Sequence, residues 1–76
     1  MTKMEKRIVS MNTEIELSLK AARVNANLTQ KQVAEKLGKN PMTIASWEKG
    51  KTSPSIKNLY RLCKLYGVPT GRIFLS

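Results

Sequence analysis

The stretch QKQVAEKLGKNPMTIASWE, residues 30–48, decides how this chain folds. Apolar residues recur in it at helical spacing, first over residues 33–37 and then at Ile44 and Trp47. Gly38 lies between the two halves and ends the first of them, because glycine adopts a left-handed backbone without steric cost. We therefore predict two short helices joined by a tight turn at Gly38.

Capping residues predict where these two helices begin. Thr29 is followed three residues later by Gln32, which is the spacing of a capping box. Asn40 and Pro41 start the second helix, because asparagine caps well and proline has no N–H to leave unpaired at the first position. Ala34 is expected at the closest approach of the two helices, where a larger side chain would separate them.

Another helix is expected before this pair. Thr13 and Glu16 have capping-box spacing, and apolar residues continue at helical spacing to about Asn25. Residues 1–12, in contrast, are polar and mixed in charge, which is typical of a flexible arm.

Two further helices are expected after the pair. Ser53 and Pro54 repeat the cap-then-proline start, and the helix that they begin ends at Gly67. Residues 70–75 are expected to form a last short helix. The sequence therefore predicts an all-α fold, a compact five-helix domain over residues 13–76 without strands.

The charge of the chain limits its partners. Fourteen Lys and Arg residues oppose five Asp and Glu, which gives a net charge of +9, and no acid follows Glu48. Such a balance suits nucleic acid or an anionic membrane surface, with a merely soluble basic surface as the alternative. Because no apolar run approaches the ~20 residues of a membrane span, we expect a cytoplasmic protein without membrane contact.

The composition also argues against several kinds of site. The chain has no His, and its single Cys, Cys63, lies on the apolar side of an expected helix. A Cys/His metal site and an internal disulfide are therefore excluded. No nucleophile stands beside a base, so we expect no enzyme, no cofactor and no small-molecule ligand.

The second helix of the central pair is expected to present one face of short, mostly uncharged side chains. If Ile44 and Trp47 dock inward, the outer face carries Asn40, Met42, Thr43 and Ser46, flanked by Lys39, Lys49 and Lys51. Such a face fits the major groove of DNA, which is about 12 Å wide. The positive N-termini of both helices can meet phosphates. We therefore expect double-stranded DNA as the partner.

The same positions resemble the helix-turn-helix family of phage repressors and Cro proteins, also called XRE-like regulators. The resemblance covers about residues 15–74 and is carried by Leu28-Thr29-Gln30, Val33-Ala34, Leu37-Gly38, Thr43-Ile44, Trp47-Glu48, Gly50-Lys51, Pro54-Ser55 and Leu65-Tyr66-Gly67-Val68. It implies a sequence-specific transcriptional regulator, chiefly a repressor, that reads an operator with helix 40–49. It also implies a homodimer on DNA.

The resemblance further implies roles for individual residues. Base contacts fall to Asn40, Pro41, Met42, Thr43 and Ser46. Phosphate contacts fall to Thr29, Gln30, Lys49 and Lys51, although Thr43 and Lys49 could each serve bases or backbone. Lys39 is not implied by the resemblance and is added to the phosphate contacts because its amine could reach a phosphate. Arg23 and Glu48 match an ion pair that ties the first helix to the end of the third.

The chain departs from the family pattern at several positions. Lys39 replaces an apolar residue, so that either its stem packs and its amine reaches a phosphate or the turn is looser. Pro41 and Met42 replace polar base readers; proline donates no hydrogen bond, and methionine makes only apolar contact, for example with a thymine methyl. Discrimination between DNA sequences must then depend on Asn40, Thr43 and Ser46 and on the shape of the DNA. Pro69 and Gly71 weaken the last expected helix.

Other interpretations remain open from the sequence. The same fold serves antitoxins and restriction-control proteins that regulate their own promoters, and it serves as a protein-interaction module without DNA. Each of three base readers has an alternative role. Asn40 could serve only as a helix cap, Met42 could be an ordinary surface residue, and Ser46 could only permit close approach of the helix to DNA. Trp47 is expected in the core rather than as a stacking platform. Dimerisation through Ile73, Phe74 and Leu75 is a hypothesis.

Overall fold

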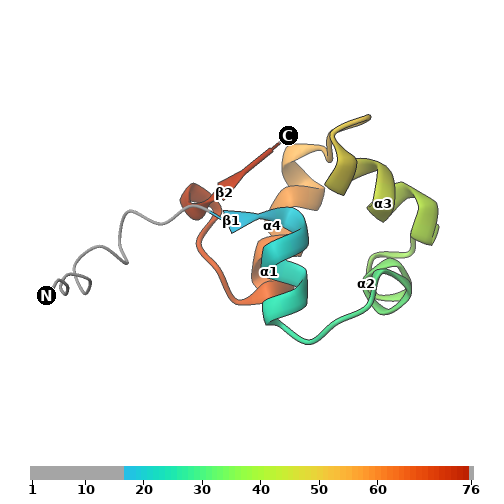
Figure 1. Ribbon diagram of the computed structural model, residues 1–76, viewed down its shortest axis with the longest axis horizontal. Helices are drawn as coiled ribbons and strands as arrows, with labels where there is room; N and C mark the ends of the chain where they lie inside the picture. The colour runs from blue at the N-terminus through green and yellow to red at the C-terminus, as the bar shows by residue number, and fades with distance from the viewer. Residues whose placement is uncertain (1–16, 76) are drawn as a thin grey trace, which may run out of the picture.

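The computed structural model describes residues 17–75, which form four α-helices, one short 3-10 turn and a two-stranded sheet (Figure 1). The helices are α1 (Leu19–Asn25), α2 (Gln30–Leu37), α3 (Pro41–Lys49) and α4 (Ile56–Tyr66). The expected arm over residues 1–12 and the expected capping box at Thr13 and Glu16 lie outside the described residues.

The central pair forms as its capping residues predict. The Thr29 hydroxyl accepts the Gln32 backbone N–H at 3.0 Å, and the Gln32 side-chain oxygen accepts the Thr29 N–H at 2.9 Å, which completes the capping box before α2. Gly38 follows α2 with a φ of 68°, in the left-handed region that glycine alone adopts freely. The predicted tight turn at Gly38 is therefore confirmed.

The first helix is shorter than expected. α1 begins at Leu19, because Ser18 is extended and its hydroxyl accepts the Ala21 backbone N–H at 3.1 Å. The prediction of helix across Leu17 and Ser18 is wrong, since these two residues form strand β1 (Leu17–Ser18).

The end of the chain also differs from the expected helix. Residues 70–75 form a 3-10 turn, η2 (Thr70–Arg72), and then strand β2 (Ile73–Phe74). β2 runs parallel to β1, with Leu17 opposite Ile73. The all-α architecture is confirmed in the main, whereas the five-helix count and the absence of strands were wrong.

Local chemistry and a distant partner together explain this difference. Pro69 has no backbone N–H and Gly71 has low helix propensity, so the segment forms only one short turn. Ile73 is β-branched and Phe74 aromatic, and both side-chain types suit a strand. The strand forms because β1, from the other end of the domain, lies alongside it (Figure 1).

The start of α4 lies two residues later than predicted. Ser55, not Ser53, is the cap, and its hydroxyl accepts the Asn58 backbone N–H at 3.2 Å. Pro54 is buried in front of the helix. Ile56, the first residue of α4, is 79% exposed, although apolar spacing along this helix would place it on the buried side.

The two serines before α4 give a direct test of this boundary. Replacing Ser55 with alanine is expected to destabilise the domain by about 1 kcal/mol, because it removes an N-cap acceptor. Ser53→Ala is the matched control and should change the free energy of unfolding by less than ~0.5 kcal/mol. Urea denaturation of both variants measures this difference, and equal effects would contradict the boundary at Ser55.

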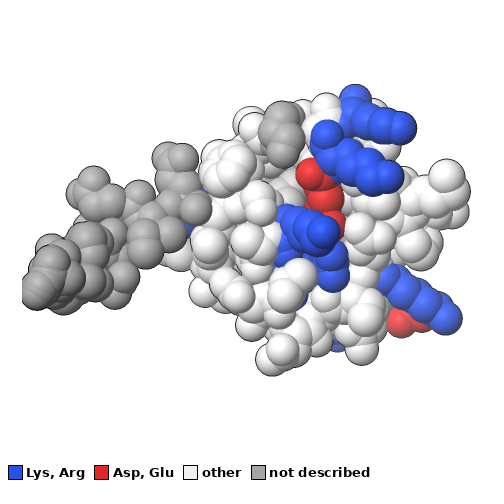
Figure 2. Space-filling view, in the orientation of Figure 1, with Lys and Arg blue, Asp and Glu red and all other residues white. Residues whose placement is uncertain are grey.

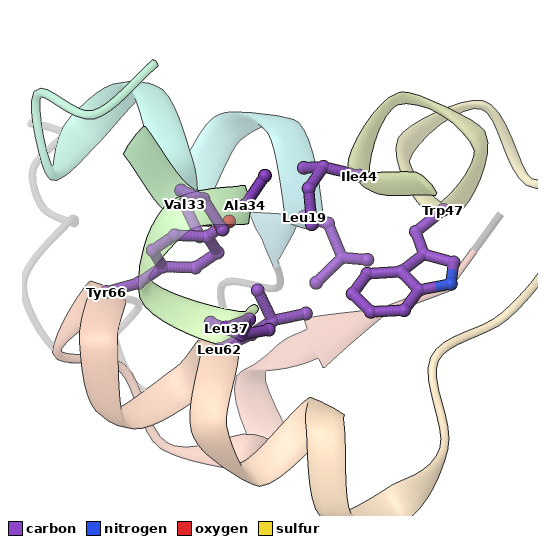
Figure 3. Close-up of a cluster of buried hydrophobic side chains, with 9 residues drawn as sticks. Leu19, Val33, Ala34, Leu37, Ile44, Trp47, Leu62 and Tyr66 are labelled. Atoms are coloured by element: carbon purple, nitrogen blue, oxygen red, sulfur yellow. The ribbon is translucent and has the colours of Figure 1, made fainter. Parts of the chain in front are cut away.

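The core lies where the four helices meet (Figure 3). Its buried members come from every helix and are Leu19, Ala22, Val33, Ala34, Leu37, Ile44, Trp47, Leu62 and Tyr66. Ala34 of α2 is 1% exposed, and α2 packs against α3. Cys63 is also buried, in agreement with its expected place in the core.

Candidate nucleic-acid interface

Helix α3 has one buried and one exposed face. Ile44 and Trp47 point into the core, which confirms the expected inward position of both side chains (Figure 3). Met42 is 77% exposed on the opposite face. The core contacts therefore fix which side of α3 is free to meet a partner.

The exposed face of α3 contains a shallow hollow. Its volume is about 240 Å³, and it is lined by Met42, Ala45, Ser46, Lys49 and Lys51. Two predicted base contacts, Met42 and Ser46, and two predicted phosphate contacts, Lys49 and Lys51, therefore lie around one hollow. Ala45 was missed by sequence reasoning, although residues 42, 45, 46 and 49 have the three- and four-residue spacing of one helical face.

The N-terminal end of α3 holds the other predicted base readers. Asn40 is exposed, and its side-chain oxygen accepts the Met42 backbone N–H at 2.8 Å, so Asn40 does serve as the helix cap. Pro41 is exposed at the first helical position, and Thr43 is half-buried. The cap uses the oxygen of Asn40, while the structure gives its amide nitrogen no hydrogen-bond partner within the described residues.

The looser turn considered at Lys39 does not form, whereas a contact of its amine with phosphate stays a prediction. The backbone N–H of Lys39 donates to the Ala34 carbonyl at 2.8 Å, directly after Gly38, so the turn is closed rather than loose. Its side chain is exposed, as are those of Lys49 and Lys51. In Figure 2 basic side chains stand at the upper right, the centre and the lower right of the face shown, with acidic atoms between the first two groups and beside the third.

The two predicted phosphate contacts at the start of α2 differ in how far their side chains are exposed and already hydrogen-bonded. Thr29 is exposed, although its hydroxyl already accepts a hydrogen bond in the capping box. Gln30 is half-buried, and its side-chain nitrogen donates to Glu48 at 3.0 Å. The contact between Gln30 and Glu48, 18 residues apart in sequence, was not predicted from the sequence.

Glu48 is the centre of a network that joins three helices. The Arg23 Nε atom lies 2.7 Å from one carboxylate oxygen of Glu48, and the side chains of this ion pair are 11% and 5% exposed. A second guanidinium nitrogen donates to the other carboxylate oxygen at 3.2 Å, and a third to the Leu28 carbonyl at 2.9 Å. The hydrogen bond to Glu48 raises the pKa of Arg23. The network therefore fixes the end of α3 against α1 and α2.

Tyr66 lies near this network from the side of α4. Burial, together with the negative charge of Glu48, raises the pKa of Tyr66 to about 12. The phenol is therefore neutral at physiological pH.

Residues 17–75 contain neither a metal site of charged and sulfur ligands nor a helical membrane span. No group of three or more His, Cys, Asp or Glu side chains is arranged to hold a metal ion there. No helix in this part of the chain is long and apolar enough to cross a membrane.

Helices α2 and α3 pack together, a left-handed glycine joins them, and one face of α3 is exposed. This arrangement defines a helix-turn-helix protein. The model of the helix-turn-helix family matches residues 19–73. The chain therefore belongs to this family of DNA-binding transcriptional regulators, the Cro/C1 type.

Three related proteins agree with this assignment. An uncharacterised HTH-type transcriptional regulator of Methanocaldococcus jannaschii is 44% identical over 57 residues, which span 75% of this chain and 86% of that protein. An uncharacterised HTH-type transcriptional regulator of Archaeoglobus fulgidus is 33% identical over 57 residues, 75% of this chain and 80% of that protein.

The third relative is a phage protein. The cryptic phage CTXphi transcriptional repressor RstR of Vibrio cholerae is 37% identical over 51 residues, which span 67% of this chain but only 46% of that protein. No solved structure matches the chain.

Proposed function

We propose that this protein is a sequence-specific repressor that lays α3 in the major groove of an operator. The observation that carries the proposal is the free face of α3, where Met42, Ala45 and Ser46 line a hollow beside Lys49 and Lys51. The relative from Vibrio cholerae is named a transcriptional repressor, which supports repression rather than activation. Bound to an operator in the cytoplasm, such a protein represses by excluding polymerase.

The proposed contacts divide into base readers and phosphate contacts. The base readers are Asn40, Pro41, Met42, Thr43 and Ser46, on or before α3. The phosphate contacts are Thr29, Gln30, Lys39, Lys49 and Lys51. Because Gln30 donates to Glu48 through its side chain, we propose that it offers its backbone N–H at the start of α2 to a phosphate, where the helix dipole favours an anion.

Selection of bound sites from random duplex DNA tests the proposal as a whole. A repressor of this type should enrich one short sequence, and its affinity should fall linearly with the logarithm of salt concentration. Absence of both an enriched sequence and a salt dependence would overturn the proposal and favour a protein-interaction module.

The role of Met42 gives a sharper prediction. Met42→Ala should reduce discrimination at one operator position by about 1–3 kcal/mol, because an apolar contact with a thymine methyl is lost. Replacing that thymine with uracil should weaken the native protein but leave the variant almost unaffected, as measured by fluorescence anisotropy.

Lys49→Ala is the control for Met42→Ala. It should weaken binding to all DNA sequences alike, because a phosphate contact carries no sequence information. The slope of log affinity against log salt concentration should become less steep by about 1. If Met42→Ala behaved in the same way as Lys49→Ala, Met42 would not be a base reader.

We further propose that two copies bind a pseudo-palindromic operator with half-sites about 34 Å apart. One copy contacts too few phosphates to bind tightly at cellular salt. The dimerisation hypothesis named Ile73, Phe74 and Leu75. Ile73 packs against the core, whereas Phe74 and Leu75 are 45% and 42% exposed. We assign the interface to these two.

Changing both residues tests this interface. Phe74→Ser combined with Leu75→Ser should convert a dimer into a monomer in sedimentation at micromolar concentration. The matched control is Val24→Ser, which alters an exposed apolar residue on α1. A dimer that survives the double change would reject this interface while leaving the DNA-binding proposal intact.

A further inference from the structure

A second hollow lies between α2 and α4. It has a volume of about 270 Å³ and is lined by Lys36, Leu37, Arg61, Lys64 and Leu65. None of these residues lines the hollow on α3. Nothing in the proposed contact with DNA uses this second surface.

The hollow combines an apolar floor with a basic rim. Leu37 is 6% exposed and points from α2 towards α4, beside Leu62 (Figure 3), and Leu65 is half-buried. The three basic side chains around them are exposed. A ligand that fits this surface therefore needs both an apolar group and several negative charges.

The charge of the rim is not neutralised within residues 17–75. No carboxylate lines the hollow, and none of its three basic side chains forms an ion pair with a described residue. Arg61 donates one hydrogen bond, of 3.4 Å, to the Lys36 carbonyl, which places the guanidinium beside the end of α2 and leaves its other N–H groups available. Of the two acids in this part of the chain, Glu48 is already paired with Arg23.

DNA fits this surface less well than a protein does. The backbone of DNA offers phosphates but no apolar group to cover the two leucines. An acidic protein segment supplies both carboxylates and an apolar side chain.

We propose that this hollow docks an acidic segment of a partner protein. One aliphatic or aromatic side chain of that segment covers Leu37 and Leu65, and its neighbouring carboxylates pair with Lys36, Arg61 and Lys64. Because the hollow and the α3 face share no residue, the partner and DNA bind the same molecule together. The surface thereby joins a regulator on its operator to a second protein.

A blocked synthetic peptide with one phenylalanine between aspartates is the probe. Its binding to the full chain is followed by NMR of methyl groups, with Leu37 and Leu65 reporting on the hollow and Met42 on the α3 face. The peptide should shift the two leucine signals and leave that of Met42 in place. The same peptide with asparagine in place of aspartate should bind at least about tenfold more weakly, because its charge pairs are lost.

Charge-reversal variants separate this site from a general effect of net charge. Arg61→Glu with Lys64→Glu should weaken peptide binding by at least about tenfold. Lys20→Glu with Lys57→Glu changes the net charge equally, at exposed residues outside the hollow, and should leave binding within about twofold.

Two results would overturn the proposal. Equal weakening by both double variants would show that only net charge attracts the peptide. Shifts of Leu37 and Leu65 by a random DNA duplex, lost in Arg61→Glu with Lys64→Glu, would assign the hollow to DNA instead.

Discussion

Replacing Glu48 with alanine should destabilise the domain by about 3–5 kcal/mol, because it leaves the guanidinium of Arg23 without its partner in a mostly buried position. The same change removes the acceptor of the Gln30 side chain, so α3 loses its link to both α1 and α2. A domain of this size has roughly 4–11 kcal/mol of stability in total, at ~0.05–0.15 kcal/mol per residue. Glu48→Ala should therefore be partly or wholly unfolded at 37 °C and unable to bind DNA.

Urea denaturation followed by the fluorescence of Trp47 measures this loss. Glu35→Ala is the matched control, since Glu35 is an exposed acid on α2, and it should change the free energy of unfolding by less than ~0.5 kcal/mol. A second variant, Arg23→Met with Glu48→Leu, should recover most of the lost stability, because no uncompensated buried charge remains. If Glu48→Ala cost no more than Glu35→Ala, the network would not hold α3 in place.

Replacing Ile44 with alanine is the other change with a large expected effect. Ile44 is 1% exposed and is among the largest fully buried side chains, so its truncation leaves a cavity between α3 and the rest of the core. We expect a loss of about 2–5 kcal/mol, which combines lost burial with the cost of the cavity.

A graded series makes the prediction for Ile44 specific. Ile44→Val removes a single methyl group and should cost about 0.5–1.5 kcal/mol. Thr43→Ala, at the half-buried neighbouring position, should cost less than either change and affect DNA binding instead. Thermal and urea unfolding monitored by circular dichroism provide the comparison. Similar losses for Ile44→Val and Ile44→Ala would contradict a tightly packed contact.

The parts of the fold that were predicted correctly depend on local chemistry. The capping box at Thr29, the cap at Asn40 and the left-handed turn at Gly38 each involve residues within four positions of one another. Such signals survive in the sequence because their physical cause is local. The start of α4 was misplaced by two residues, since Ser53 and Ser55 are both capable caps, and only the structure shows that Ser55 accepts the Asn58 backbone N–H.

The parts that were missed depend on contacts between distant residues. β1 and β2 are two residues each and pair across almost the whole domain, so neither strand has a recognisable pattern of its own. The donation from Gln30 to Glu48 and the hollow between α2 and α4 likewise need the helices in place. Ala45 could have been predicted from the sequence, because it lies three residues after Met42 and four before Lys49, on the same face of α3.

For the stretch over residues 30–48, the sequence by itself determined two helices, the turn between them and the face of α3 that carries short side chains. Tertiary structure decided what those side chains are free to do. Packing of Ile44 and Trp47 turned one face of α3 inward, and the side chain of Gln30, expected to contact phosphate, donates to the carboxylate of Glu48 instead. The physical reason is that caps and turns are short-range interactions, whereas burial and buried charge pairs exist only after distant segments meet.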